Sequence, residues 1–281
     1  MTDTVYQISH LTLVTKRHYG RMIGAVLVLT VLAIVIHAFA VGQIEWNYVA
    51  EFLTVPVIMK GLVNTIVMAI LAMVVGIVLG IVFAIMRLSD NPVLSMTALG
   101  YVWLFRAIPA LLQLLLWFNL ALVFPTIGIP ALFSINTVDV MTPFVAALLG
   151  LGIQQGAFTA EVVRAGLLSV DRGQYEAAQT IGMTRLQMLR RIVMPQAMRV
   201  IVPPVGNEFI GMVKLTSLAS VIQYAEILHS AQNIYYANSR VIELLIVAAI
   251  WYLVVVTILS LIQGRIEKYF SKGVAAAGNT K

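Results

Sequence analysis

Three stretches of this sequence carry no Asp, Glu, Lys or Arg, and their length limits the possible folds more than any other feature. They run from residues 22 to 44, 61 to 86 and 244 to 264. Each exceeds the roughly 20 residues with which an α-helix crosses the hydrocarbon of a bilayer. Only 11% of the 281 residues are charged, too few to cover the surface of a soluble domain. Because the weak alternating segments of a membrane β-barrel are also absent, the sequence predicts an all-α membrane protein.

Six spans account for the apolar segments, and two of them contain prolines beyond their first residue. The spans are expected at about residues 22–43, 61–86, 97–124, 143–168, 200–222 and 242–264. The third contains Arg106 and Pro109. In the fifth, Pro203 and Pro204 are expected at the start of the helix, where a missing N–H costs little.

The first apolar segment also resembles a secretory signal peptide. Lys16, Arg17 and Arg21 precede it, and the Ala-Phe-Ala sequence of residues 38–40 matches an A-x-A cleavage site. The apolar run is longer than the roughly 7–15 residues of such a region, so an uncleaved span is favoured.

The distribution of Lys and Arg gives the orientation of the spans. An even number of spans places both termini on one side, and fourteen of the 18 Lys and Arg residues fall there. They are Lys16, Arg17, Arg21, Arg87, Arg164, Arg172, Arg185, Arg190, Arg191, Arg199, Arg265, Lys268, Lys272 and Lys281. Lys60 and Arg240 fall on the other side, and Arg106 and Lys214 lie within spans. Positive charge gathers in cytoplasmic loops, so the termini and residues 169–199 are expected in the cytoplasm.

Composition also excludes several classes of function. The absence of Cys excludes disulfides, thiol nucleophiles and Cys-ligated metal sites. The net charge of +6 is accounted for by the cytoplasmic loops, and no basic soluble domain is present that would bind nucleic acid. The sequence contains no G-x-x-x-x-G-K-[ST] phosphate loop, so the chain is not expected to hydrolyse ATP. The four histidines form no metal-ligand pair, and we expect packing or loop roles for them: His10, His18, His37 and His229.

A charged segment interrupts the apolar pattern between the fourth and fifth spans. It reads YEAAQTIGMTRLQMLRRIVMP from residue 175 to residue 195. Residues 171–181 contain good helix formers, and Gly182 can adopt the left-handed conformation that ends a helix. The pattern therefore predicts a first cytoplasmic helix that ends at a glycine turn.

A second helix is expected to follow the turn. Thr184 and Gln187 form a capping-box pattern, and Pro195 is expected to limit the helix. Four apolar residues at i, i+3, i+6 and i+7 are expected on one side: Leu186, Leu189, Ile192 and Val193. Two roles fit such a helix–turn–helix, an amphipathic hairpin on lipid headgroups or a docking element for a partner protein.

The spacing within this segment resembles the EAA loop of ATP-binding-cassette importer permeases and favours the docking role. The family pattern is E-A-A, three residues, G, nine residues and I-x-L-P. Both gaps match here, and Met194 stands where the pattern has Leu. The matching residues, which the resemblance assigns to coupling with the ATPase, are Glu176, Ala177, Ala178, Gly182, Ile192 and Pro195.

Longer segments resemble the polar amino acid permeases within that class. They are FTAEVVRAGLLSVDRGQYEAAQTIG, MPQAMRVIVPPVGNEFIGMVKLTSLASVI and, less closely, FRAIPALLQL. In the last of these, Ala107 and Ile108 stand where the family shows Gly and Thr. The likeness covers about residues 57–272, which leaves 1–56 as a cytoplasmic N-terminus with an added span and 273–281 as a cytoplasmic tail.

The resemblance implies a fold, a set of partners and a location. The fold is a type I importer permease core of five transmembrane helices with one extra N-terminal helix, in the bacterial cytoplasmic membrane. The permease pairs with itself or a paralogue, two cytoplasmic ATPase subunits bind below it, and an extracytoplasmic binding protein delivers a polar amino acid. The loop at about residues 171–195 couples to the ATPase. The chain is then no enzyme and binds no cofactor, since ATP and Mg belong to the ATPase.

Five charged residues lie inside spans or at their ends: Arg106, Glu161, Arg164, Glu208 and Lys214. An ionisable group in hydrocarbon costs a few kcal/mol or more, so each is a candidate for function. Glu161 and Arg164 are three residues apart and can pair on one helix. Glu208 and Lys214 are six apart, about 120° around a helix, so each needs a partner elsewhere or a water-filled cavity.

These charges suggest a path for a zwitterionic substrate. Arg106 and Lys214 can donate to its carboxylate, and Glu161 or Glu208 can accept from its ammonium. The candidate path residues are Arg106, Gln113, Glu161, Glu208, Lys214, Thr216 and Ser217. A static network that ties the helices together is the competing explanation.

Two other classes of membrane protein are the rivals to an importer subunit. A self-contained secondary transporter or channel should show paired inverted repeats with broken helices in both halves, and no matching second half is visible. A scaffold without transport activity leaves the charges within spans unexplained. Gly76 and Gly80 form a small-x-x-x-small seam, for which close packing within the bundle is favoured over dimerisation.

Overall fold

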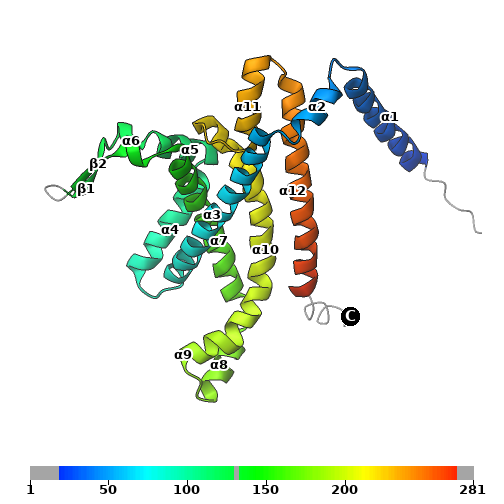
Figure 1. The fold of residues 1–281 in the computed structure, drawn as a ribbon. Helices are drawn as coiled ribbons and strands as arrows, with labels where there is room; N and C mark the ends of the chain where they lie inside the picture. The colour runs from blue at the N-terminus through cyan, green and yellow to red at the C-terminus, as the bar shows by residue number, and fades with distance from the viewer. Residues whose placement is uncertain (1–18, 130–132, 271–281) are drawn as a thin grey trace, which may run out of the picture. The chain divides into compact units, whose positions relative to one another are not determined.

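A computed structural model describes residues 19–129 and 133–270, and almost all of its elements are helices (Figure 1). The expected cytoplasmic tail at 273–281 and most of the segment before the first span lie outside these residues. The helices and strands are α1 (Tyr19–Val41), α2 (Trp46–Phe52), α3 (Pro56–Arg87), α4 (Pro92–Ala107), α5 (Ala110–Phe118), η1 (Leu120–Leu122), β1 (Thr126–Ile129), β2 (Phe133–Asn136), α6 (Thr137–Val140), α7 (Pro143–Leu168), α8 (Arg172–Thr180), α9 (Arg185–Met188), η2 (Leu189–Val193), α10 (Met194–Leu215), η3 (Thr216–Ile222), α11 (Ile227–Asn238) and α12 (Val241–Phe270).

The N-terminal span forms a unit of its own. Residues 1–45 separate from residues 46–281, and α1 is the helix of the first unit. It is long and apolar enough to cross a membrane, and none of its residues is buried within the described structure. A helix that is apolar on all sides suits a lipid environment.

Three spans of the second unit agree with the sequence prediction, and two of them pack closely through glycines. Helices α3, α7 and α12 are single helices that are long and apolar enough to cross a bilayer. A Cβ added at Gly76 would lie 2.5 Å from the side chain of Gln155, and one at Gly80 would lie 2.7 Å from that of Thr159. The predicted glycine seam therefore serves the packing of α3 on α7.

The third span is broken, which corrects the expectation of one helix over residues 97–124. Helices α4 and α5 meet at an angle of 102°. Pro109 has no N–H, and its ring disfavours helical geometry at Ile108, which takes φ −83° and ψ 129°. Beyond α5 the chain forms a short antiparallel hairpin in which Thr126 of β1 lies opposite Asn136 of β2.

The helix that contains the fifth span begins earlier than predicted, and the two prolines of the span lie in the interior of that helix. A continuous helical run extends from Arg185 to Ile222. Pro203 and Pro204 are inside α10 rather than at its start, and Pro195 sits in its first turn without ending the run. Pro195 does not end the run because the π-helical turn η2, immediately before it, shifts the hydrogen-bond register by one residue.

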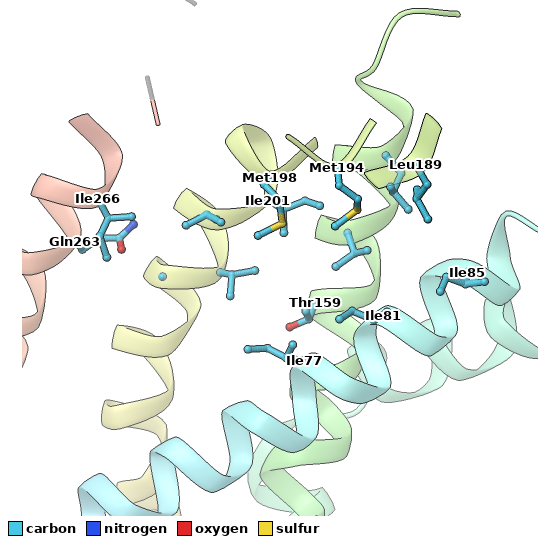
Figure 2. A pocket seen from close by; sticks show the side chains of 15 residues that line it. Ile77, Ile81, Ile85, Thr159, Leu189, Met194, Met198, Ile201, Gln263 and Ile266 are labelled. Carbon is cyan, nitrogen blue, oxygen red and sulfur yellow. The ribbon is translucent and has the colours of Figure 1, made fainter. Parts of the chain in front are cut away.

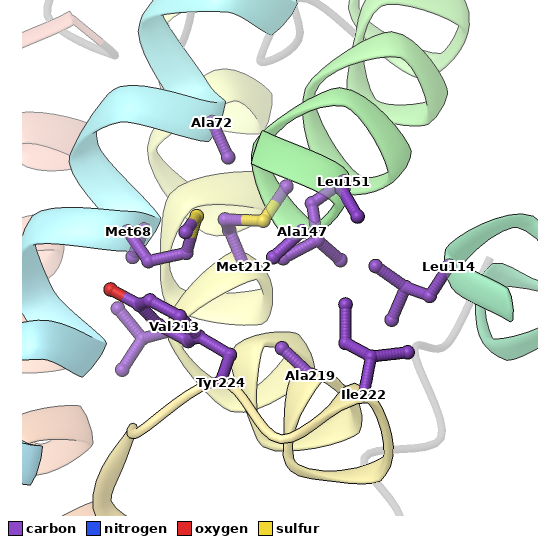
Figure 3. Close-up of a cluster of buried hydrophobic side chains, with 12 residues drawn as sticks. Met68, Ala72, Leu114, Ala147, Leu151, Met212, Val213, Ala219, Ile222 and Tyr224 are labelled. Carbon is purple, nitrogen blue, oxygen red and sulfur yellow. The ribbon is translucent and has the colours of Figure 1, made fainter. Parts of the chain in front are cut away.

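The core of the second unit lies where the broken and continuous spans meet (Figure 3). Met68 of α3, Leu151 of α7 and Met212 of α10 are almost fully buried there. Leu114 of α5 and Ile222 of η3 close the cluster, so the bend after α4 is held by packing as well as by its proline.

Candidate functional site

The charged segment between α7 and α10 forms the predicted helix–turn–helix. Asp171 caps α8, since its Oδ1 accepts a hydrogen bond of 2.7 Å from the N–H of Gly173. Gly182 ends the turn with φ +74°, a conformation that costs glycine little. Thr184 and Gln187 form a capping box in which each side chain bonds the backbone N–H of the other. The predicted glycine turn and capping box are confirmed, and the cap by Asp171 adds to them.

The second helix differs from the prediction in which residues it buries. Leu186 is 73% exposed and Leu189 is also exposed, whereas Val193 is 1% exposed. The four apolar residues therefore do not form one packed face. The π-helical turn at residues 189–193 rotates the side chains that follow it relative to those before it.

The turn of this segment, between α8 and α9, lies at one end of the bundle (Figure 1). Glu176 and Ala177 are exposed, whereas Ala178 is buried. Ile181 is 74% exposed, close to the exposed Leu186 in the chain. Large apolar side chains exposed on a polar hairpin are typical of a protein-binding surface.

The other side of the segment is fixed to the bundle. Val193 and Ala197 are buried against Val163 and Val170, on α7 and just after it. The hydroxyl of Tyr175 donates to the carbonyl of Leu167 at 3.3 Å. Because both helices of the segment contact the end of α7, and the second helix continues into α10, the segment is held stiffly.

Two of the intramembrane carboxylates have different kinds of partner. Glu161 forms an ion pair with Arg164, with Nη2 and Nε at 2.6 and 3.2 Å from Oε2, as the sequence predicts. Glu208 has no ion pair among the described residues. Its Oε2 accepts hydrogen bonds from Gln155 Nε2 at 2.8 Å and Thr159 Oγ1 at 3.1 Å, so α7 supplies neutral donors to a charge on α10.

Arg106 and Gln113 flank the break between α4 and α5. The guanidinium of Arg106 lies over the ring of Phe158 at 5.2 Å and is close enough to both Glu161 and Glu208 for Coulomb attraction. The amide of Gln113 is 2% exposed and donates to the carbonyls of Phe105 and Ile108, at 3.0 and 2.9 Å. Gln113 therefore satisfies the carbonyls that the bend frees.

The remaining three candidates lie further along α10 and η3. The side chain of Lys214 is exposed and forms no ion pair or hydrogen bond with another described residue. The hydroxyls of Thr216 and Ser217 each donate to a carbonyl of their own helix at 2.7 Å. The structure thus brings Arg106, Glu161 and Glu208 into one electrostatic neighbourhood, and it does not bring Lys214 into contact with them.

Three neutral polar residues of α7 that contact this region were not identified from the sequence. Gln155 and Thr159 bond Glu208, and Gln154 donates to the carbonyl of Ile108 at 3.4 Å. Their signal was present as polar residues inside an apolar span; Gln155 and Thr159, four residues apart, face α10, and Gln154 faces the break between α4 and α5.

Sequence reasoning also missed a buried carboxyl outside the spans. Glu226 is 0% exposed and caps α11 through bonds from the N–H groups of Leu228 and His229, at 2.9 and 2.7 Å. The hydroxyl of Tyr252 on α12 donates to it at 2.7 Å. Burial raises the pKa of Glu226 above its ordinary value, because the charged form is poorly solvated there.

Comparison with known proteins gives one family and several close relatives. The family described as "Binding-protein-dependent transport system inner membrane component" matches residues 76–272. The arginine transport system permease protein ArgU of Corynebacterium glutamicum is 37% identical over 92% of this chain and 82% of its own. The L-cystine transport system permease protein TcyB of Bacillus subtilis is 36% identical over 83% of this chain and 94% of its own.

A solved structure resembles the fold as a whole. It is described as an amino acid ABC transporter with histidines, and it matches with a TM-score of 0.70 and 31% identity. The match covers 81% of this chain and 99% of that chain. The fold is therefore that of a type I importer permease.

Glu226 should make the stability of the protein depend on pH. A carboxyl whose pKa is raised in the folded state stabilises the fold fully below the ordinary glutamate pKa, and this contribution is lost as the pH rises through the raised value. Thermal unfolding of the purified protein should therefore show a midpoint that falls across that pH window. Glu226→Gln should flatten the fall, because the amide oxygen still accepts from the cap and does not ionise. An equal fall in both proteins would show that other groups cause it.

Proposed function

We propose that this chain moves a polar amino acid across the bacterial cytoplasmic membrane. The chain belongs to the family of binding-protein-dependent transport system inner membrane components, and this membership supports the proposal. The chain is the permease subunit of an ATP-driven importer and has no catalytic activity of its own. Its expected partners are two ATPase subunits, a second permease subunit and an extracytoplasmic binding protein. ATP and Mg are then used by the ATPase, and this chain holds no cofactor.

The proposed function requires both termini in the cytoplasm, and the distribution of Lys and Arg favours this orientation. Fourteen of the 18 Lys and Arg residues fall on the side of the termini and of the segment at 171–195. Cytoplasmic termini place that segment where an ATPase can reach it. Helix α11 and the hairpin of β1 and β2 then lie toward the binding protein.

The observation that carries the coupling role is the continuity of the helical run that follows the glycine turn. Glu176 and Ala177 are exposed beside a rigid, doubly capped turn, and the run from Arg185 to Ile222 passes Glu208 without a break. A displacement of the turn by a partner therefore moves the wall that carries Glu208. A flexible connection would absorb the displacement, whereas a packed two-state element transmits it.

The substrate path is the second part of the proposal. Arg106, Glu161 and Glu208 offer charges of both signs near the broken span, which suits an amino acid with a carboxylate and an ammonium. Glu208 is the best acceptor among them, since its present partners are neutral and no bonded cation cancels its charge. Gln113, Lys214, Thr216 and Ser217 complete the proposed path.

Substitutions in the coupling segment should separate ATP use from transport. Gly182→Val forces a branched side chain into a positive φ angle, and Glu176→Lys reverses an exposed charge at the proposed contact. Uptake and ATP hydrolysis should be measured in vesicles that contain the full complex. Both variants should insert into the membrane and lose ATP-driven uptake. Normal coupled uptake in both would contradict the assignment, and Gly100→Val, at an open helical position, controls for the added side chain.

Removing the charge of Glu208 should impair transport without disassembling the complex. Glu208→Gln keeps the shape of the side chain, and uptake should fall about tenfold, as expected for the loss of one charged hydrogen bond. Glu267→Gln, which alters a hydrogen-bonded carboxyl near the end of α12, should leave uptake near normal. Failure of Glu208→Gln to assemble would support the static network, and normal uptake would remove Glu208 from the path.

A further inference from the structure

An apolar pocket of about 410 Å³ opens between four helices of the second unit (Figure 2). Ile81 and Ile85 of α3 line one side, and Met198 of α10 and Ile266 of α12 line others. Leu189, in the π-helical turn, places the pocket in the half of the bundle that carries the coupling segment. It borders the contacts that Glu208 makes to α7, because Thr159 both lines the pocket and donates to Glu208.

The pocket offers almost nothing to a polar ligand. Only two of its lining side chains, Thr159 and Gln263, are polar. The hydroxyl of Thr159 donates to Glu208 and accepts from Gln155, so both of its roles are filled. The amide N–H groups of Gln263 donate to the carbonyl of Pro203 at 2.8 Å and to Glu267 at 3.1 Å. A polar amino acid would lose its hydration there without compensation, so the occupant must be apolar.

Four arginines lie next to pocket-lining residues in the chain, although none of them lines the pocket itself. Arg190 and Arg191 follow Leu189 directly, Arg199 follows Met198, and Arg265 precedes Ile266. All four are exposed, and none forms an ion pair or a side-chain hydrogen bond with another described residue. Two carboxyls lie near this wall, and both have neutral partners: Glu267 is bonded to Asn207 and Gln263, and Glu208 to Gln155 and Thr159.

We propose that the pocket holds an acyl chain of an anionic phospholipid whose headgroup is bound by these arginines. An acyl chain can pack against the apolar lining. A phosphate or phosphatidylglycerol headgroup can accept charge-assisted hydrogen bonds from the guanidinium groups, which have no ion pair with another described residue. The wall formed by α10 belongs to the run that links the coupling segment to Glu208. A lipid seated between α10 and α12 therefore contacts the moving element and tunes its position.

Photochemical labelling tests this site in the full complex, reconstituted in vesicles of phosphatidylethanolamine. The probes are phosphatidylglycerol and phosphatidylcholine, each with a diazirine in one acyl chain. The phosphatidylglycerol probe should label peptides from residues 189–206 and 263–266 more strongly than the phosphatidylcholine probe. Val202→Trp, which fills the pocket, should abolish this labelling, and Leu253→Trp, on an exposed face of α12, should not change it.

A surface variant keeps the test independent of any packing defect. Arg199→Gln should lower labelling by phosphatidylglycerol about fivefold, the factor that one cation contributes beside an anionic lipid. The same variant should leave labelling by phosphatidylcholine unchanged, and Arg172→Gln on α8 serves as the matched control. Equal labelling by the two probes, persistence of labelling in Val202→Trp, or cross-links from the pocket to a second permease copy would each overturn the proposal.

Discussion

Hydrocarbon supplies no hydrogen-bonding partner, and the rest of this structure depends on how the protein meets that constraint. The bend at Pro109 frees backbone carbonyls in mid-span, and Gln113 and Gln154 donate to them. Glu208 receives donors from Gln155 and Thr159 on the neighbouring helix. The bend at Pro109 and the carboxyl of Glu208 are therefore both paired with neighbouring amides or a hydroxyl, and these hydrogen bonds connect α4, α5, α7 and α10.

The proposed coupling segment is joined to the interior by one continuous helical run. Its first helix lies outside the spans, and Glu176 and Ile181 are exposed there. Its second helix continues through Pro195 into α10, so no flexible loop separates the docking surface from the polar layer. The π-helical turn preserves this continuity, because it shifts the register where the proline would otherwise end the helix.

The sequence predicted the parts of this arrangement that depend on local chemistry. The glycine turn at Gly182, the capping box at Thr184 and the pairing of Glu161 with Arg164 each depend on residues close in the chain. The spans without prolines in their interior were also predictable, since apolar length alone identifies them.

The parts that failed depend on tertiary contacts. Whether Pro109 kinks, breaks or begins a helix is decided by the neighbours that satisfy the freed carbonyls, here Gln113 and Gln154. Whether Pro195 ends a helix is decided by the register of the turn before it. The role of a neutral polar residue such as Gln155 depends on the charged group that faces it. The sequence therefore identified Glu208 but not the residues that donate to it.

In the proposed coupling mechanism, the run from Arg185 to Ile222 moves as one rigid body when ATP binds to the partner ATPase. The Cys-free chain allows spin labels at Leu186→Cys and Val221→Cys, both exposed and separated by about 50 Å at 1.5 Å per residue. A second pair, Leu186→Cys with Ile85→Cys, reports motion against α3. Pulsed electron–electron distance measurements in the full complex, diluted with unlabelled permease, should show a narrow and unchanged first distance and a shifted second distance on trapping with ATP. A first distance that broadens or changes, with the second constant, would contradict the account.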